Sequence, residues 1–189
     1  FSKLNNLNSI SLRFFNVAGS YRNISKDLFG ELHDEETHLI PRILNNKSVI
    51  VNGTDFDSPD GTCVRDYVHV VDLARAIRLS IEKRNSKHHK IYNLWSGNGS
   101  SVLEVITEAE KLIFSKIIIK NEPAKNGDPA YLVADSKLAK TELGWVSQFP
   151  LKKIIEESKS GKFEVTPEQF DNITAAIEDA FENGVVTSD

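Results

Sequence analysis

Segments with the composition of β-strands alternate with segments of helical periodicity along residues 10–143, and this alternation constrains the fold more than any other feature. The β-rich runs are SLRFFN, which ends at Asn16, followed by SVIVN, KIYNLW, KIIIK and YLVAD. Amphipathic helices are predicted over residues 38–46, 70–84, 100–113 and 136–143. Strands that alternate with helices predict an α/β fold in which part of the sheet is parallel.

Capping and turn signals support the ends of these helices. Ser101 and Glu104 have the spacing of a capping box, Pro41 suits a first helical turn, and Gly144 ends the 136–143 helix. In the 70–84 helix the apolar residues fall on one face, namely Val70, Leu73, Ala74, Ile77 and Ile81. Residues 18–37 are polar and contain glycine, which predicts a long loop.

The sequence changes character after residue 158. A further amphipathic helix is predicted over residues 166–184, with Thr166 and Gln169 as a capping pair and Gly184 at its end. Its apolar stripe suits packing within the protein better than docking to a partner. We therefore divide the chain into a main part, residues 1–158, and an unassigned tail, residues 159–189.

Composition narrows the class of protein. The formal net charge of -4 and the isoelectric point of about 5.8 argue against sequence-independent nucleic-acid binding, which needs a basic surface. No apolar run approaches the length of a membrane span, so no membrane association is expected. A single cysteine, Cys63, fits a reducing cytoplasm. Because the sequence contains no methionine, we expect it to begin downstream of the natural start of the protein.

Two motifs suggest ligand binding but have the wrong spacing. His33 and His38 are five residues apart, whereas a metalloprotease helix needs its histidines four apart, so HDEETH is interpreted as a polar loop without a metal. The turn SGNGSSV follows a strand and precedes a helix, where a dinucleotide fingerprint belongs. Val102 stands in place of the third glycine, which favours turning and capping over phosphate binding.

Arg65 and Tyr67 lie in DGTCVRDYVHVVDLARAI, between a turn and the start of a helix. Two residues apart in an extended segment, they point to the same face. The planar guanidinium of arginine matches phosphate oxygens. Spacing alone supports this anion-binding role and a surface ion pair of Arg65 with Asp66 or Asp60 equally.

A second polar cluster, PAKNGDPAY at 123–131, places Lys125 and Asp128 around Gly127 in a turn. The lysine could reach a phosphate and the aspartate could accept hydrogen bonds from ribose hydroxyls. A solvated turn without a ligand is an equally good interpretation of these residues alone.

Five segments taken together resemble the UDP-glucose 4-epimerases, which are extended short-chain dehydrogenase/reductases. The segments, in the order and rough spacing of that family, are SLRFFNVAG, DEETHLIPRIL, NGTDFDSPDGTCVRDYVHVVDLARA, IYNLWSGNGSSVLEVI and GDPAYLVADSKLAKTELGW. The resemblance covers about residues 10–158. It implies the C-terminal, substrate-binding part of a Rossmann-type NAD enzyme. It also implies that residues 1–17 and about 65–95 pack on a dinucleotide-binding half that this sequence lacks.

The resemblance also implies a site for a UDP-sugar substrate. In it, Arg65 would clamp the diphosphate, the strand at 50–52 would flank the uracil, and Phe15 would lie beside NAD. The substrate-binding residues would be Asn16, His38, Leu39, Ile50, Val51, Asn52, Arg65, Lys125, Asp128 and Tyr131.

Some positions depart from the family. Ala124 and Lys125 stand where two arginines are usual, and Asn52 stands where an aromatic residue is common. The glycine-rich NAD loop and the catalytic Tyr-x-x-x-Lys pair are absent, since Tyr21 and Lys26 are one residue too far apart. No catalytic residue is therefore assigned, and we expect this chain alone to be inactive.

The family implies a cytoplasmic, homodimeric isomerase of galactose metabolism that interconverts UDP-glucose and UDP-galactose through an NAD-dependent 4-keto intermediate. Two alternatives stay open at this stage. The chain could be part of another sugar-nucleotide enzyme, such as a dehydratase or decarboxylase. It could also be a catalytically inactive remnant that binds nucleotide-sugars.

Overall fold

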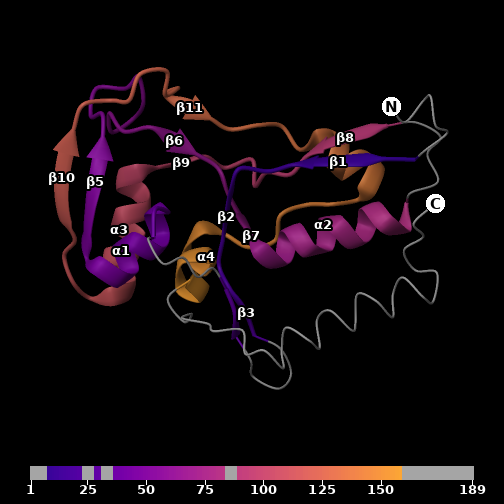
Figure 1. Cartoon of the computed structure of the whole chain (residues 1–189), viewed down its shortest axis with the longest axis horizontal. Helices are drawn as coiled ribbons and strands as arrows, with labels where there is room; N and C mark the ends of the chain where they lie inside the picture. Colours follow the sequence, from indigo (N-terminus) through magenta and orange to yellow (C-terminus); the bar gives the residue numbers. More distant parts are fainter. Residues whose placement is uncertain (1–7, 23–27, 31–35, 84–88, 159–189) are drawn as a thin grey trace.

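A computed structural model describes residues 8–22, 28–30, 36–83 and 89–158, and it has the α/β fold that the sequence predicts (Figure 1). Four of its strand pairs are parallel and two are antiparallel. The described residues form two clusters of buried apolar side chains, one toward each end of the molecule, with short strands between them.

The first cluster lies around a parallel pair made of β5 (Ser48–Asn52) and β10 (Ile118–Glu122). Helices α1 (Leu39–Asn46), α3 (Val102–Ile113) and α4 (Leu151–Ser158) pack beside it. Figure 1 shows α1 and α3 next to this pair, with α4 toward the middle of the molecule. The fully buried side chains that join these elements include those of Ile43, Val51, Val105 and Ile154.

The second cluster lies around the parallel pair of β1 (Ile10–Arg13) and β8 (Lys90–Asn93). Helix α2 (Val70–Glu82) runs alongside (Figure 1), and a π-helical turn, η1 (Ala139–Leu143), adds Leu143 to the core. Trp145 is fully buried, and its indole nitrogen donates to the carbonyl of Asp72 at 2.8 Å. This hydrogen bond joins α2 to the segment that follows η1.

Short strands connect the two clusters. β2 (Asn16–Ala18) pairs with β7 (Tyr67–His69), and β6 (Val64–Arg65) pairs with β9 (Ser100–Ser101) and β11 (Tyr131–Leu132). The β6–β7 segment therefore runs through the middle of the molecule.

The predicted elements are confirmed with differences in detail. The capping box of Ser101 and Glu104 is present, and Gly144 ends the 136–143 segment in a left-handed conformation. The prediction of a single strand that ends at Asn16 is wrong, because the chain bends at Phe14 and Phe15 and Asn16 begins β2. The predicted loop at 18–37 contains a short antiparallel pair, β3 (Tyr21–Arg22) and β4 (Leu28–Phe29). The predicted 166–184 helix and His33 lie outside the described residues.

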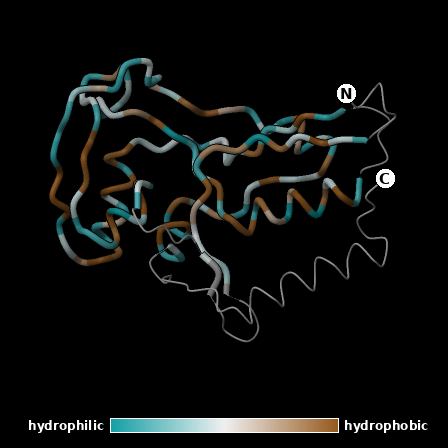
Figure 2. The backbone as a smooth tube through the Cα atoms, viewed as in Figure 1, coloured by the Kyte–Doolittle hydropathy of each residue, from teal (hydrophilic) through white to brown (hydrophobic). Residues whose placement is uncertain are grey.

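Helix α2 buries a different face from its apolar stripe. Asp72, Ala76 and Ser80 are buried, whereas Ile77 and Ile81 remain 47% and 40% exposed. Figure 2 shows hydrophobic and hydrophilic residues alternating along this helix. The buried Asp72 carboxylate explains the orientation, because it accepts hydrogen bonds from Arg75 and from the 147–149 segment.

None of the helices in the described ranges is both long enough and apolar enough to cross a bilayer.

Asp66 anchors the central β6–β7 segment. Its side chain is 1% exposed and accepts hydrogen bonds from the backbone and hydroxyl of Ser96 and from the backbone of Gly97, at 2.5–3.0 Å. Its carbonyl oxygen accepts from the amide of Asn16 at 2.9 Å. A buried carboxylate with several donors is strongly held, and its loss would leave those donors unsatisfied.

We predict that Asp66→Asn lowers the free energy of unfolding by about 1.5–3 kcal/mol, because an amide cannot accept all of these hydrogen bonds. Urea denaturation of the purified chain would measure the change. Asp57→Asn, at an exposed position of the 54–62 turn, serves as the control and should leave the midpoint within the error of the method. An equal midpoint for both variants would show that Asp66 does not anchor the segment.

Candidate functional site

A cavity of about 520 Å³ gathers most of the residues predicted to bind a UDP-sugar. It lies among α1, β5, β6 and the segment after β10. Nine predicted residues line it: Asn16, His38, Leu39, Ile50, Val51, Asn52, Arg65, Lys125 and Asp128. We call this space the nucleotide cavity. The structure brings the nine together from five separate stretches of the chain, while their contacts with a ligand stay a prediction.

Arg65 is held in place at the wall of the nucleotide cavity. Its Nη1 donates to the carbonyl oxygens of Val64 and Pro129, both at 2.9 Å, and its Nη2 lies 3.6 Å from Asp128 Oδ1. The Arg65 side chain is 14% exposed. These contacts fix the plane of the guanidinium before any ligand arrives, which lowers the entropic cost of binding.

The surface ion pairs considered for Arg65 are not formed. Asp66 binds the 96–97 turn on the other side of the strand, and Asp60 accepts hydrogen bonds from Thr62 and Ser101. The carboxylate beside Arg65 is that of Asp128, a predicted ribose-binding residue. The ion pair of Arg65 is therefore with a residue of the same cavity, and its contact with a ligand stays a prediction.

Tyr67 lies beside Arg65 on the same face of the segment, as the extended spacing predicts. The ring is 8% exposed and belongs to the first apolar cluster, and burial raises the pKa of its hydroxyl well above the usual range. Tyr67 is therefore a neutral residue of the cavity wall.

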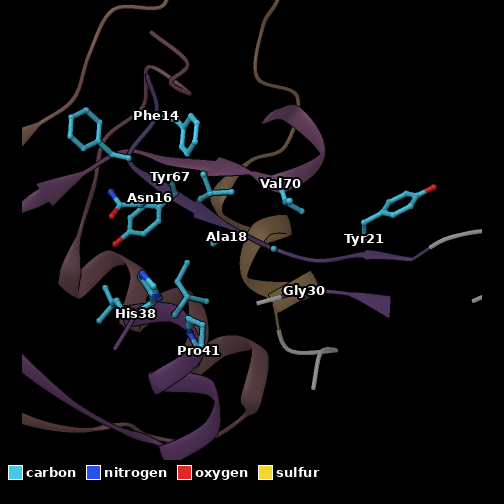
Figure 3. Close-up of a pocket in the computed structure, with 14 residues that line it drawn as sticks. Phe14, Asn16, Ala18, Tyr21, Gly30, His38, Pro41, Tyr67 and Val70 are labelled. Carbon is cyan, nitrogen blue, oxygen red and sulfur yellow. The ribbon is translucent and has the colours of Figure 1, made fainter. Parts of the chain in front are cut away.

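A second, mainly apolar cavity of about 570 Å³ adjoins the first (Figure 3). Asn16, His38, Leu39 and Tyr67 line both cavities. In Figure 3 the side chains of Asn16, Tyr67 and His38 lie close together, whereas Tyr21 points away. The four shared residues form the boundary between the two spaces.

Phe15, which the resemblance places beside NAD, lines this apolar cavity. Its ring is 53% exposed and lies 4.3 Å from that of Trp95, measured between ring centroids. Tyr131 is different, because it lies on β11 with 52% of its surface exposed and is not among the residues that line these two cavities. Its contact with a sugar stays a prediction without support from this geometry.

Sequence reasoning missed Arg42, which lines the nucleotide cavity from α1. Arg42 follows Leu39 by three residues, and residues three apart lie on one face of a helix. Since Leu39 was a predicted site residue at the start of a predicted helix, this spacing could have identified Arg42. Cys63, Thr37 and Glu122 also line the cavity and were not predicted to do so.

The turn between β8 and α3 is not built to bind a pyrophosphate. The Gly97 turn is held by Asp66, and the α3 helix begins with a capping box whose Glu104 carboxylate occupies the first turn. A negative charge there opposes the binding of a pyrophosphate, which helix N-termini otherwise favour. Within residues 8–22, 28–30, 36–83 and 89–158, no group of three His, Cys, Asp or Glu side chains is placed to hold a metal ion.

Comparisons with known proteins identify the family of the chain. The family model described as "NAD dependent epimerase/dehydratase family" matches residues 1–94. The chain belongs to this family. Over 158 residues it is 42% identical to the UDP-glucose 4-epimerase of Corynebacterium glutamicum, covering 80% of this chain and 46% of that protein.

Solved structures give the same result for the fold. A UDP-glucose 4-epimerase from Bifidobacterium longum, in complex with NAD+ and UDP, matches with a TM-score of 0.75 and 34% identity, over 82% of this chain and 47% of that one. The enzyme from Brucella ovis, in complex with NAD, matches with a TM-score of 0.76 and 35% identity, over 84% and 50%. The chain therefore spans about half the length of the relatives that it matches.

Cys63 offers a chemical probe of the nucleotide cavity, since it is the only cysteine in the sequence. Burial, above all, raises the pKa of its thiol, so the reactive thiolate is scarcer at pH 8 than in a free cysteine. We predict slow alkylation by iodoacetamide that speeds up as the pH rises, and further slowing in the presence of UDP. Mass spectrometry of the Cys63 peptide would measure both rates against glutathione. Modification as fast as that of glutathione, or unchanged by UDP, would contradict the prediction.

Proposed function

We propose that this chain provides the UDP-sugar-binding part of a UDP-glucose 4-epimerase, an NAD-dependent isomerase that interconverts UDP-glucose and UDP-galactose. The observation that carries the proposal is the Arg65 guanidinium, fixed at the wall of a cavity that nine predicted substrate-binding residues line. The relatives named UDP-glucose 4-epimerase and the solved structure in complex with UDP support it.

In this proposal the charged residues bind the diphosphate and the ribose of UDP. The N–H groups of Arg65 that are not used within the protein donate to the diphosphate, and Lys125 adds a second cation from the opposite segment. Asp128, held near Arg65, accepts hydrogen bonds from the ribose hydroxyls. Ile50, Val51 and Asn52 of β5 flank the uracil.

Asn16 occupies the junction of the two cavities. One hydrogen of its amide binds the carbonyl of Asp66, so the rest of the amide is free to contact the diphosphate. His38 and Leu39 lie along the same boundary. The sugar would then extend toward the apolar cavity. A firmly bound UDP supports chemistry at the hexose, because binding energy from a non-reacting group can be used at the reacting one.

The exposed apolar surface near β1 supports the proposal that a separate dinucleotide-binding half packs against this chain. Residues 1–17 and about 65–95 would form the contact. Among the described strands β1 pairs with β8 alone. Phe14, Ile77 and Ile91 are 44%, 47% and 37% exposed nearby. When bound, NAD would supply hydride transfer, and in this chain only Phe15 is proposed to contact it. The homodimer and the cytoplasmic location of the whole protein belong to the same proposal.

We predict that Arg65→Ala weakens UDP binding about ten- to hundredfold, which corresponds to the loss of charge-assisted hydrogen bonds worth about 1.5–3 kcal/mol. Isothermal titration calorimetry with UDP would measure the two dissociation constants. Arg78→Ala is the matched control, because Arg78 is an exposed α2 residue paired with Glu82. Equal affinities of the Arg65 variant and the wild type would remove Arg65 from this role.

We also predict that the 189-residue chain alone, supplied with UDP-galactose and NAD, forms no UDP-glucose. The sequence contains no Tyr-x-x-x-Lys pair to serve as the base at the sugar hydroxyl. A coupled assay that detects UDP-glucose is a suitable measurement, with a complete epimerase as the positive control. Turnover by the purified chain would refute the prediction.

A further inference from the structure

Arg42 is a cation of the nucleotide cavity that the proposed set of UDP-binding residues does not include. It lies in α1, is partly buried, and lines the cavity together with Arg65 and Lys125. The three cations come from α1, from β6 and from the segment after β10. The question is whether protein groups already neutralise the charge of Arg42.

The contacts of the cavity's charged residues answer this question. Glu122 is 2.8 Å from Lys120, and Asp128 is 3.6 Å from Arg65, so each acidic residue of the cavity has a cation of its own. Within the described ranges, the guanidinium of Arg42 makes no ion pair or hydrogen bond, and neither does the ammonium of Lys125. Among the described residues, the nucleotide cavity therefore carries two cations that no acidic side chain compensates.

An uncompensated, partly buried guanidinium is expensive to keep in place, because it loses hydration without gaining a partner. An anion that enters the cavity removes this cost and gains charge-assisted hydrogen bonds. Lys125 offers a compact point charge, whereas the planar fork of arginine can bind two oxygens of one phosphate. The charge and the shape of Arg42 thus both suit a phosphate group.

We propose that Arg42 is a further ligand-binding residue, which holds the diphosphate of the nucleotide together with Arg65 and Lys125. The proposal rests on the proposed function, since it takes a UDP-sugar as the occupant of the nucleotide cavity. It deepens that function by placing the diphosphate between α1 and the β6 strand. In a cavity of this size, a cation on any wall lies close enough to the diphosphate to attract it.

The test compares UDP affinity among wild type, Arg42→Gln and Arg42→Lys by calorimetry. Arg42→Gln removes the charge and should raise the dissociation constant about five- to thirtyfold. Arg42→Lys keeps the charge but loses the planar fork, so its dissociation constant should lie between those of wild type and Arg42→Gln. Arg78→Gln makes the same change at an exposed α2 residue outside the cavity and should bind UDP like the wild type. Circular dichroism of each variant checks that the fold is retained.

The outcomes separate this inference from the proposed function. If the wild type binds UDP and Arg65→Ala weakens it, but Arg42→Gln does not, only the role of Arg42 is overturned. If Arg42→Lys binds as weakly as Arg42→Gln, charge is not what Arg42 contributes, and the inference is also overturned. If the wild type does not bind UDP, the proposed function fails and this inference fails with it.

Discussion

The alternation of side chains along one extended segment, residues 64–69, determines how the rest of the structure is arranged. Arg65 and Tyr67 face the nucleotide cavity and the first apolar cluster. Asp66 and Val68 face the opposite way, Asp66 onto the 96–97 turn and Val68 into the second cluster. Because side chains in a strand alternate with a period of two, a shift of one residue would exchange the two sets. It would bury the guanidinium and turn a fully buried carboxylate toward the ligand.

This arrangement separates the residues that stabilise the segment from the residues that are free to bind. The buried carboxylate of Asp66 has its donors within the protein and is part of the framework. Arg65 is positioned mainly by two backbone carbonyl groups, which carry no net charge. The guanidinium therefore keeps most of its positive charge for an incoming anion, with Asp128 as its one acidic partner among the described residues.

Local signals in the sequence predict much of the fold. The 39–46 helix, the strand before Gly53 and the capping box at Ser101 follow from short-range spacing and are present. The bend at Phe14 and the face that α2 buries could not be predicted in this way. They depend on partners distant in the sequence, such as the 147–149 segment that binds Asp72. Apolar periodicity shows that a helix has two faces. In α2 the hydrogen bonds that the Asp72 carboxylate accepts decide which face is buried.

In the candidate site, too, some residues could be predicted from sequence motifs and others only from the tertiary structure. Nine residues carried over from the family resemblance meet in one cavity, while Tyr131 on β11 does not join them. The spacing of Arg42 from Leu39 could have placed it on the face of α1 that lines the cavity. That it has no acidic partner among the described residues follows only from the tertiary structure.

The four hydrogen bonds that Asp66 makes to distant parts of the chain also bear on how the protein folds. Its carbonyl binds a residue 50 positions earlier, and its carboxylate binds residues 30 positions later. Contacts between such distant positions close large loops, and chains rich in them fold slowly. Each helix depends on local hydrogen bonds, whereas the strand that carries Arg65 is held by partners far away in the sequence. The wall of the cavity that Arg65 forms is therefore complete only after these distant segments have met.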